Sequence, residues 1–255
     1  MCTLALYLRI FDDHPLVVAA NRDEFYDRPS APPALLGSNP TILAGKDLLA
    51  GGTWLGVNEY GVLVGILNRR SNAENSHSDS LRSRGLLCLD VLRCKSAWRA
   101  SEFLSEHHGS QYQPFTLVFA DKEAAWVAFN AEDRIELAEL NVGLHVFSNA
   151  SVDDARLEKI NHARERFARL INDDTQDLHI PSQWIPSFQN VLSDHTVANI
   201  GKDTKNAICV HAESSGTVSS SLIFYSQIDR RFQTFYCPGP PCQFSFSESC
   251  HLTVR

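Results

Sequence analysis

The first residues of the chain combine side chains that could carry out nucleophilic chemistry. Cys2 becomes the terminal residue if one methionine is removed, and it then holds a thiol and a free α-amine together. Such an amine can take the thiol proton, so a single residue supplies both the nucleophile and its base. Asp23 follows one short hairpin later and could return a carboxylate to that amine. The pattern predicts attack of a thiolate on an amide or ester carbonyl, with Cys2 and Asp23 as catalytic residues.

A purely structural role is the alternative for these residues. A cysteine at the start of a strand also serves as a small buried hydrophobe, and Cys2 has no free amine if Met1 is retained. The polar run that starts at Asn21 could be a strand end held by a salt bridge. Because side chains alternate along a strand, Asn21 and Asp23 share one face and Arg22 lies on the other. We assign Asn21 and Asp23 to the site and Arg22 to a structural role.

Apolar runs bounded by turn residues predict that most of these side chains lie on strands. The strands are expected at residues 3–11, 16–23, 41–44, 50–57, 61–68, 114–120, 124–130, 134–140, 142–149, 207–212, 217–226 and 231–237. Helical spacing of apolar residues predicts helices at about 85–95, 97–107, 154–171 and 181–193. The prolines at positions 29, 32 and 33 are expected to end regular structure, and the polar segment 71–84 is expected to form an exposed loop and a candidate lid.

These elements follow the order strands, two helices, strands, a long helix and strands, without a visible repeat or linker. Antiparallel meanders with grouped helices favour an α+β fold, in which two mainly antiparallel sheets are covered by helices on both outer faces. We expect a single domain that spans residues 1–255.

Composition and charge exclude several classes of protein. Of the 255 residues, 44% are hydrophobic, which is enough for a single core. The net charge of -7 and the lack of a basic run argue against nucleic acid as a partner. The seven cysteines are irregularly spaced in a long chain, which favours free thiols in a reducing compartment. We see no signal peptide and no apolar run of about 18 residues, so we expect a cytoplasmic protein without a transmembrane segment.

Three groups of residues resemble the NRDE family, which includes the transport-and-Golgi-organisation protein and its bacterial relatives: Cys2, the run Asn21-Arg22-Asp23-Glu24, and Gly51-Gly52-Thr53-Trp54. The likeness continues through residues 65–69, 148–149 and 215–221, and so covers nearly the whole chain. It implies the N-terminal-nucleophile hydrolase fold, with four layers in the order αββα. It also implies a relation to the cysteine amidases that open penicillin V and conjugated bile salts.

The resemblance implies roles for particular residues. Asp23 matches the aspartate that holds the terminal amine of those amidases, Asn68 an asparagine near their nucleophile, and Asn149 their oxyanion-hole asparagine. With Cys2 these residues form the expected catalytic set. Two arginines that steady the thiolate or the substrate are replaced here by Ala20 and Val218. The residues expected to bind substrate are Asn21, Trp54, Arg69, Thr217 and Ser219.

The expected function is hydrolysis of the amide bond of a small or acylated substrate, without a cofactor. The alternative is a carrier without catalysis, because the resemblance links eukaryotic relatives to haem, to acyl-coenzyme A or lipid handling, and to Golgi organisation. A carrier would hold an amphipathic ligand, with haem as a candidate cargo. A third reading is an interaction protein that keeps the fold without a working site. The oligomeric state is left open.

No metal site is expected. Cys209 and His211 would share one face of a strand, but the sequence shows no third ligand beside them. A rigid proline turn at the surface is favoured over a metal cluster for four residues near the end of the chain: Cys237, Cys242, Cys250 and His251.

Overall fold

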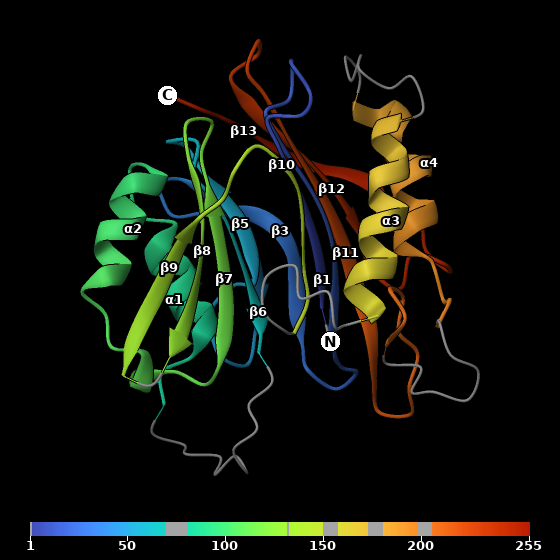
Figure 1. Ribbon diagram of the computed structural model, residues 1–255, viewed down its shortest axis with the longest axis horizontal. Helices are drawn as coiled ribbons and strands as arrows, with labels where there is room; N and C mark the ends of the chain where they lie inside the picture. The colour runs from blue at the N-terminus through green and yellow to red at the C-terminus, as the bar shows by residue number, and fades with distance from the viewer. Residues whose placement is uncertain (1, 70–80, 132, 150–157, 173–180, 198–205) are drawn as a thin grey trace. The chain divides into compact units, whose positions relative to one another are not determined.

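The computed structural model describes residues 2–69, 81–131, 133–149, 158–172, 181–197 and 206–255. Two antiparallel sheets and four α-helices make up these residues (Figure 1). The chain divides into two compact units, the first formed by Met1–Arg28 and Val142–His251, the second by Pro29–Asn141 and Leu252–Arg255. Each unit contains one sheet and two of the helices. The expectation of one domain for the whole chain stays a prediction.

The sheet of the first unit contains the strands that carry the candidate nucleophile. Its strands lie in the order β10-β1-β2-β11-β12-β13. Their bounds are Gly143–Phe147 for β10, Thr3–Leu8 for β1, Leu16–Phe25 for β2, Ser215–Ser226 for β11, Arg231–Cys237 for β12 and Ser247–Thr253 for β13. The first two strands of the chain are central and buried on both faces, which explains why their sequences lack polar alternation.

Two helices cover one face of this sheet. They are α3, Glu158–Asn172, and α4, Pro181–Leu192, which lie side by side in Figure 1. Every second residue of the central strands faces them, and the core includes Tyr7, Val17, Phe167, Phe188 and Phe224. Tyr7 is fully buried, and its hydroxyl donates a hydrogen bond of 2.8 Å to the backbone oxygen of Phe167 in α3. This bond joins the first strand of the chain to the long helix.

The second unit is a continuous meander. Its strands keep the sequence order in space, from β3 to β9. They are β3 Ser30–Leu36, β4 Ile42–Asp47, β5 Leu55–Asn58, β6 Leu63–Asn68, β7 Phe115–Ala120, β8 Ala125–Ala131 and β9 Arg134–Glu139. Helices α1, Arg84–Val91, and α2, Ala97–Ser105, pack on this sheet, and a short 3₁₀ helix, Gly109–Gln111, follows them.

The Gly-Gly-Thr-Trp motif joins β4 to β5 and permits close packing in the second unit. A Cβ on Gly52 would lie 2.2 Å from a backbone carbon of Gly85, at the start of α1, so only glycine fits there. The indole of Trp54 lies against Gly45 of β4, where a Cβ would meet ring carbons at 2.7 Å. Core packing therefore accounts for Trp54 within its own unit.

Three expectations about local structure were wrong. The prolines at 32 and 33 lie within β3, because β3 is an edge strand with a register shift between Ala31 and Ala34, where the missing N–H groups cost nothing. Residues 207–212 form an irregular segment with one isolated bridge, His211 to Gly216, in place of a strand. Strand β13 follows in the tail, where the sequence predicted no strand beyond residue 237. Of the candidate lid at 71–84, residues 71–80 lie outside the described part of the chain.

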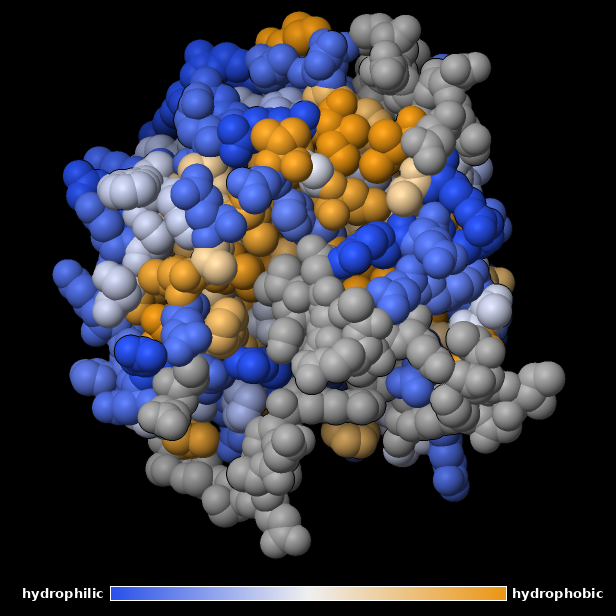
Figure 2. All heavy atoms as spheres, in the orientation of Figure 1, coloured by the Kyte–Doolittle hydropathy of each residue, from blue (hydrophilic) through white to orange (hydrophobic). Residues whose placement is uncertain are grey.

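Within the described residues, none of the helices has the length and apolar character needed to cross a membrane. Figure 2 shows hydrophobic patches between hydrophilic areas on the face that it draws. Large exposed hydrophobic side chains occur in both units, among them Phe25, Leu49, Trp98 and Ile228.

Candidate active site around Cys2

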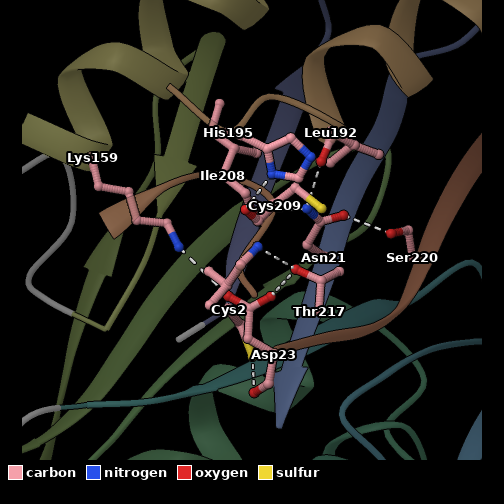
Figure 3. Close-up of polar contacts among 11 residues, drawn as sticks. Cys2, Asn21, Asp23, Lys159, Leu192, His195, Ile208, Cys209, Thr217 and Ser220 are labelled. Carbon is pink, nitrogen blue, oxygen red and sulfur yellow. Dashed lines mark hydrogen bonds and ion pairs between the residues drawn. The ribbon is translucent and has the colours of Figure 1, made fainter. Parts of the chain in front are cut away.

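Cys2 lies at the entrance to β1, beside the end of β2. The last recorded pair of these strands is Thr3 with Asn21. The thiol of Cys2 is half-buried and lies 3.7 Å from the backbone oxygen of Asp23, to which it can donate a weak hydrogen bond (Figure 3). The structure thus places the thiol of Cys2 beside the backbone of Asp23, and the predicted contact between the Asp23 carboxylate and an α-amine on Cys2 stays a prediction. The contact involves the backbone of Asp23, because its carboxylate has other partners.

The carboxylate of Asp23 is buried and is held from two sides. The hydroxyl of Thr217 donates a hydrogen bond of 2.7 Å to Oδ1. The Nζ of Lys159, from α3, lies 3.5 Å from Oδ2, and the two side chains are only 5% and 1% exposed (Figure 3). Such a buried pair is costly to break, because one charge is then left without compensation. Asp23 is therefore a fixed acceptor at the end of β2.

Lys159 is the residue of this site that the sequence analysis missed. Two arginines were expected near the thiolate or the substrate, and Ala20 and Val218 stand at their positions. A buried cation reaches Asp23 from a helix more than a hundred residues later instead. The apolar period predicted that helix, but the period alone does not show that Lys159 points at the end of β2.

Asn21 makes buried hydrogen bonds to three segments of the first unit, and its role in binding substrate stays a prediction. Its Nδ2 donates two hydrogen bonds of 2.9 Å, to the backbone oxygens of Leu192 and Ile208. Its Oδ1 accepts a bond of 2.6 Å from the hydroxyl of Ser220. All of these polar groups are buried, so Asn21 joins the end of α4, the segment before β11 and β11 itself. These bonds use both N–H groups of the amide, while Oδ1 keeps one lone pair beyond the bond from Ser220.

The register places the remaining residues of the first unit on two faces of the sheet. A bulge at Val218 pairs Thr217 with Asp23 but Ser219 with Arg22. Thr217 therefore lies with Asp23 on the face covered by helices, and Ser219 lies on the opposite face. The substrate-binding role expected of Thr217 and Ser219 stays a prediction.

A row of polar side chains crosses the sheet at Cys2. Continuing the β1–β2 register by one residue sets Arg22 opposite Cys2, and continuing the β1–β10 register by two sets Asn149 on its other side. Ser219 extends the row on β11. The Oγ of Ser219 and the Oδ1 of Asn149 are buried, and neither has a hydrogen-bond partner in the part of the chain that the structure describes. Buried polar atoms of this kind point to a bound molecule or water.

The other predicted site residues belong to the second unit. Asn68 ends β6 opposite Phe115 and is exposed. The guanidinium of Arg69 lies over the ring of Phe129, 4.8 Å from its centroid, and donates to the backbone oxygen of Asn130 at 3.4 Å. The predicted roles of Asn68, Arg69 and Trp54 beside Cys2 stay predictions.

Burial raises the pKa of the Cys2 thiol above its ordinary value of 9.0, and the negative charge of Asp23 adds to this shift. The positive chain terminus acts in the opposite direction and is outweighed. A raised pKa means a smaller thiolate fraction at any given pH, and the thiolate is the reactive species. In a chain that keeps Met1, the raised pKa therefore favours the protonated form of the Cys2 thiol.

Alkylation of Cys2 by iodoacetamide should therefore show a pH midpoint above 9.0 in a chain that retains Met1. Site-resolved mass spectrometry of the modified peptides measures the rate at each pH. In urea the midpoint should return towards the ordinary value, because burial and the charge of Asp23 no longer act on the thiol. A midpoint below 9.0 in the folded chain with Met1 retained would contradict the assigned environment.

Sequence comparison places this site in a known family context. The family model for Transport and Golgi organisation 2 matches residues 1–235. A Transport and Golgi organization protein 2 homolog from Bos taurus is 29% identical over 238 residues, which cover 82% of this chain and 81% of that protein. A Transport and Golgi organization 2 homolog from Mus musculus is 50% identical over 111 residues, covering 42% of this chain and 38% of the mouse protein.

Solved structures resemble this chain over most or all of its length. An N-acylethanolamine-hydrolyzing acid amidase ortholog from Caenorhabditis elegans has a TM-score of 0.57 at 15% identity, covering 87% of this chain and 92% of that one. A variant of conjugated bile acid hydrolase from Clostridium perfringens has a TM-score of 0.58 at 11% identity, covering 100% and 98%. These likenesses confirm the predicted N-terminal-nucleophile hydrolase fold and, at such identities, concern the fold alone.

Proposed function

Because the chain belongs to the Transport and Golgi organisation 2 family and has the fold of N-terminal-nucleophile hydrolases, we propose that it is an amidohydrolase whose nucleophile is Cys2. The observation that carries this proposal is the polar row across the sheet. Cys2 lies beside the backbone of Asp23, and the register sets it between Asn149 and Arg22. The similar solved structures bear the names of enzymes that hydrolyse N-acylethanolamines and conjugated bile acids, which suggests an N-acyl substrate.

The proposed reaction begins after Met1 is removed. The α-amine of Cys2 takes the thiol proton, and the thiolate attacks the amide carbonyl. The carbonyl oxygen gains the negative charge, which the amide N–H group of Asn149 stabilises; losing one such donor costs about a hundredfold or more in rate. The C–N bond then breaks, and the leaving amine takes the proton from the α-ammonium. Water hydrolyses the thioester and restores the thiol.

Asp23 and Lys159 act as positioning residues in this proposal. The α-amine that appears on Cys2 would join Lys159 near the carboxylate of Asp23. Thr217 holds the same carboxylate through Oδ1, which keeps it in place when the amine becomes charged. The ion pair with Lys159 also neutralises Asp23, so its charge raises the pKa of the thiol less than an uncompensated carboxylate would.

The test begins with the intact mass of the purified full chain, which shows whether Met1 is present. A panel of N-acyl amino acids and N-acylethanolamines is then assayed by release of the free acid. We expect hydrolysis by the processed chain and none by Cys2→Ala. Cys250→Ala, which changes a half-buried free cysteine on β13, is the matched control and should keep full activity. Activity that persists in Cys2→Ala, or in a chain that keeps Met1, would overturn the proposal.

A carrier function is the second candidate, and one pocket favours it. In the second unit a cavity of about 520 Å³ lies beside α1 and α2. Its lining combines the rings of Phe103 and Tyr112 with Arg82 and Arg93, both of which are paired with Asp90. Two arginines and one aspartate leave a net positive charge beside the rings, which favours an amphipathic anion. His107 lines it, and its Nδ1 lies 2.8 Å from the backbone oxygen of Phe103, which leaves Nε2 available to a ligand such as haem iron.

Haem and acyl-coenzyme A titrations test this second candidate. A carrier should bind one of them saturably at micromolar concentration, with no loss of ligand to hydrolysis. If haem binds through His107, His107→Ala should shift its absorption spectrum and weaken binding. The adjacent exposed His108, which does not line the cavity, supplies the control variant His108→Ala. Lack of saturable binding of both ligands would exclude this role for the pocket.

A further inference from the structure

Four side chains with sulfur or imidazole ligand atoms converge at the edge of the first unit. They come from three segments that are distant in sequence: His195 follows α4, Cys209 and His211 precede β11, and Cys242 lies in the turn between β12 and β13. One ligand atom from each lies within 4.8 Å of the others. The sequence showed the pair Cys209 and His211, and the folded chain adds the third and fourth groups.

The separations match those of a tetrahedral metal site. Zinc binds cysteine sulfur at about 2.3 Å and histidine nitrogen at about 2.0–2.1 Å, so tetrahedral ligands lie roughly 3.8 Å apart for two sulfurs and roughly 3.6 Å for sulfur and nitrogen. In the structure the sulfurs of Cys209 and Cys242 are 3.8 Å apart. The Nε2 of His211 lies 3.8 Å from Cys209 Sγ and 3.3 Å from Cys242 Sγ. These three separations lie close to the tetrahedral values, and the ligand atom of His195 lies within 4.8 Å of the other three.

The ring of His195 is oriented for the same purpose. Its Nδ1 lies 3.1 Å from the backbone oxygen of Cys209 (Figure 3). A carbonyl oxygen only accepts hydrogen bonds, so Nδ1 carries the proton and Nε2 keeps its lone pair. Metal-binding histidines usually donate their second ring N–H to a carbonyl or carboxylate in this way. The rings of His195 and His211 are 5.1 Å apart between centroids.

Buried hydrogen bonds hold the segments that carry these ligands. Asn21 binds the backbone oxygens of Leu192 and Ile208, three residues and one residue before the first two ligands (Figure 3). The backbone N–H of Cys209 donates to the oxygen of Asp194 at 2.9 Å. The turn that carries Cys242 is tied to α4, because the amide of Gln189 donates to Pro241 at 2.8 Å and to Phe244 at 3.1 Å. The cluster is thus preorganised by the fold.

We propose that His195, Cys209, His211 and Cys242 bind one zinc ion as a structural site with four protein ligands. Sulfur and imidazole in a tetrahedral S₂N₂ set select zinc among the divalent metals commonly available. Each thiol releases one proton to solvent when the ion binds as the dication, and the ion and two thiolates then form a neutral set. This inference replaces the expectation of no metal, which was based on Cys209 and His211 without the other two residues.

The zinc site would stabilise the surroundings of Asp23 without taking part in the proposed hydrolysis. The backbone N–H of Val210, between two ligands, donates to the hydroxyl of Thr217 at 2.9 Å. That hydroxyl donates in turn to Asp23. Fixing residues 209–211 with an ion therefore fixes the partner of Asp23, by a route that does not depend on whether Cys2 is a nucleophile.

Metal content of the full chain tests this proposal directly. The protein is produced without a histidine tag, dialysed under reducing conditions and analysed by inductively coupled plasma mass spectrometry. We expect one zinc per chain. Replacement by Co²⁺ should give the intense ligand-field bands of tetrahedral cobalt and a thiolate charge-transfer band. Cys242→Ser and His211→Asn should weaken zinc binding at least about tenfold.

Matched controls separate the site from the other thiols and imidazoles. Cys250→Ser and His251→Asn, both on β13 and outside the cluster, should keep one zinc per chain. A chelator should lower the melting temperature of the unsubstituted chain but not of Cys242→Ser, whose changed side chain is exposed, so folding should survive. The site would be overturned if the wild-type protein bound no zinc after zinc was added. It would also be overturned if both Cys242→Ser and His211→Asn kept the zinc content of the wild type. A disulfide between Cys209 and Cys242 that persists after dialysis under reducing conditions would overturn it as well.

Discussion

Lys159→Met should destabilise the protein by about 3–5 kcal/mol, because it leaves the buried carboxylate of Asp23 without its cation. The melting temperature should fall by about 6–20 °C, or the chain should fail to fold at physiological temperature. Chemical denaturation with matched fluorescence and circular dichroism measures the free energy of unfolding. The N-terminal residue is established by intact mass first, because a free α-amine on Cys2 would supply a second cation near Asp23.

The exposed pair Lys122 and Glu123 supplies the control for this change. Its side chains are 58% and 78% exposed, and Lys122→Met should change stability by less than about 1 kcal/mol. A double variant, Lys159→Met with Asp23→Leu, should be more stable than Lys159→Met alone, because no buried charge remains uncompensated. A cost below about 1 kcal/mol for Lys159→Met would show that this ion pair does not form in solution.

Asn21→Ala should cost about 3 kcal/mol or more, since it removes the partners of three buried polar groups, each worth about 1–3 kcal/mol when left unsatisfied. The effect should be concentrated where Asn21 joins Leu192 to Ile208. Amide hydrogen exchange should become faster in α4 and in residues 206–211, and its rate should change less elsewhere. The free energy of unfolding is measured as above.

Asn190→Ala gives the matched control for the asparagine change. Asn190 lies exposed on α4, and its replacement should alter stability by no more than about 0.5 kcal/mol. If Asn21→Ala and Asn190→Ala were equally stable, the assignment of Asn21 as a structural connector would be contradicted. A role of Asn21 in binding substrate would then be favoured.

Much of the architecture follows from local patterns in the sequence. Apolar strands such as 16–23 and 61–68, and the helical period of 154–171, are recorded in the spacing of hydrophobic residues, because burial of one face is what stabilises each element. The predictions of secondary structure were wrong at Pro32 and Pro33, which lie within a strand, and at residues 207–212, which do not form one. A proline in the sequence does not show whether its strand lies at the edge of a sheet, where proline is tolerated. An apolar run does not show whether a neighbouring strand will supply hydrogen-bond partners.

In the candidate site, too, some contacts follow from neighbours in the sequence and others depend on the tertiary structure. The position of Cys2 beside the backbone of Asp23 follows from the pairing of β1 with β2 in one hairpin, which is local in sequence. Lys159, which holds Asp23, and the bulge at Val218, which separates Thr217 from Ser219, depend on how distant segments pack. Spacing within one strand cannot reveal either feature.

The sequence by itself determined the strand carrying Asp23, the hairpin back to Cys2 and the family to which the chain belongs. Only the tertiary structure decided which side chains meet. It joined Asn21 to Leu192 and Ile208 by hydrogen bonds, and it added His195 and Cys242 to Cys209 and His211. The physical reason is that local order depends on neighbours in the chain, whereas a buried charge or a metal site needs partners that only the folded chain brings within a few ångströms.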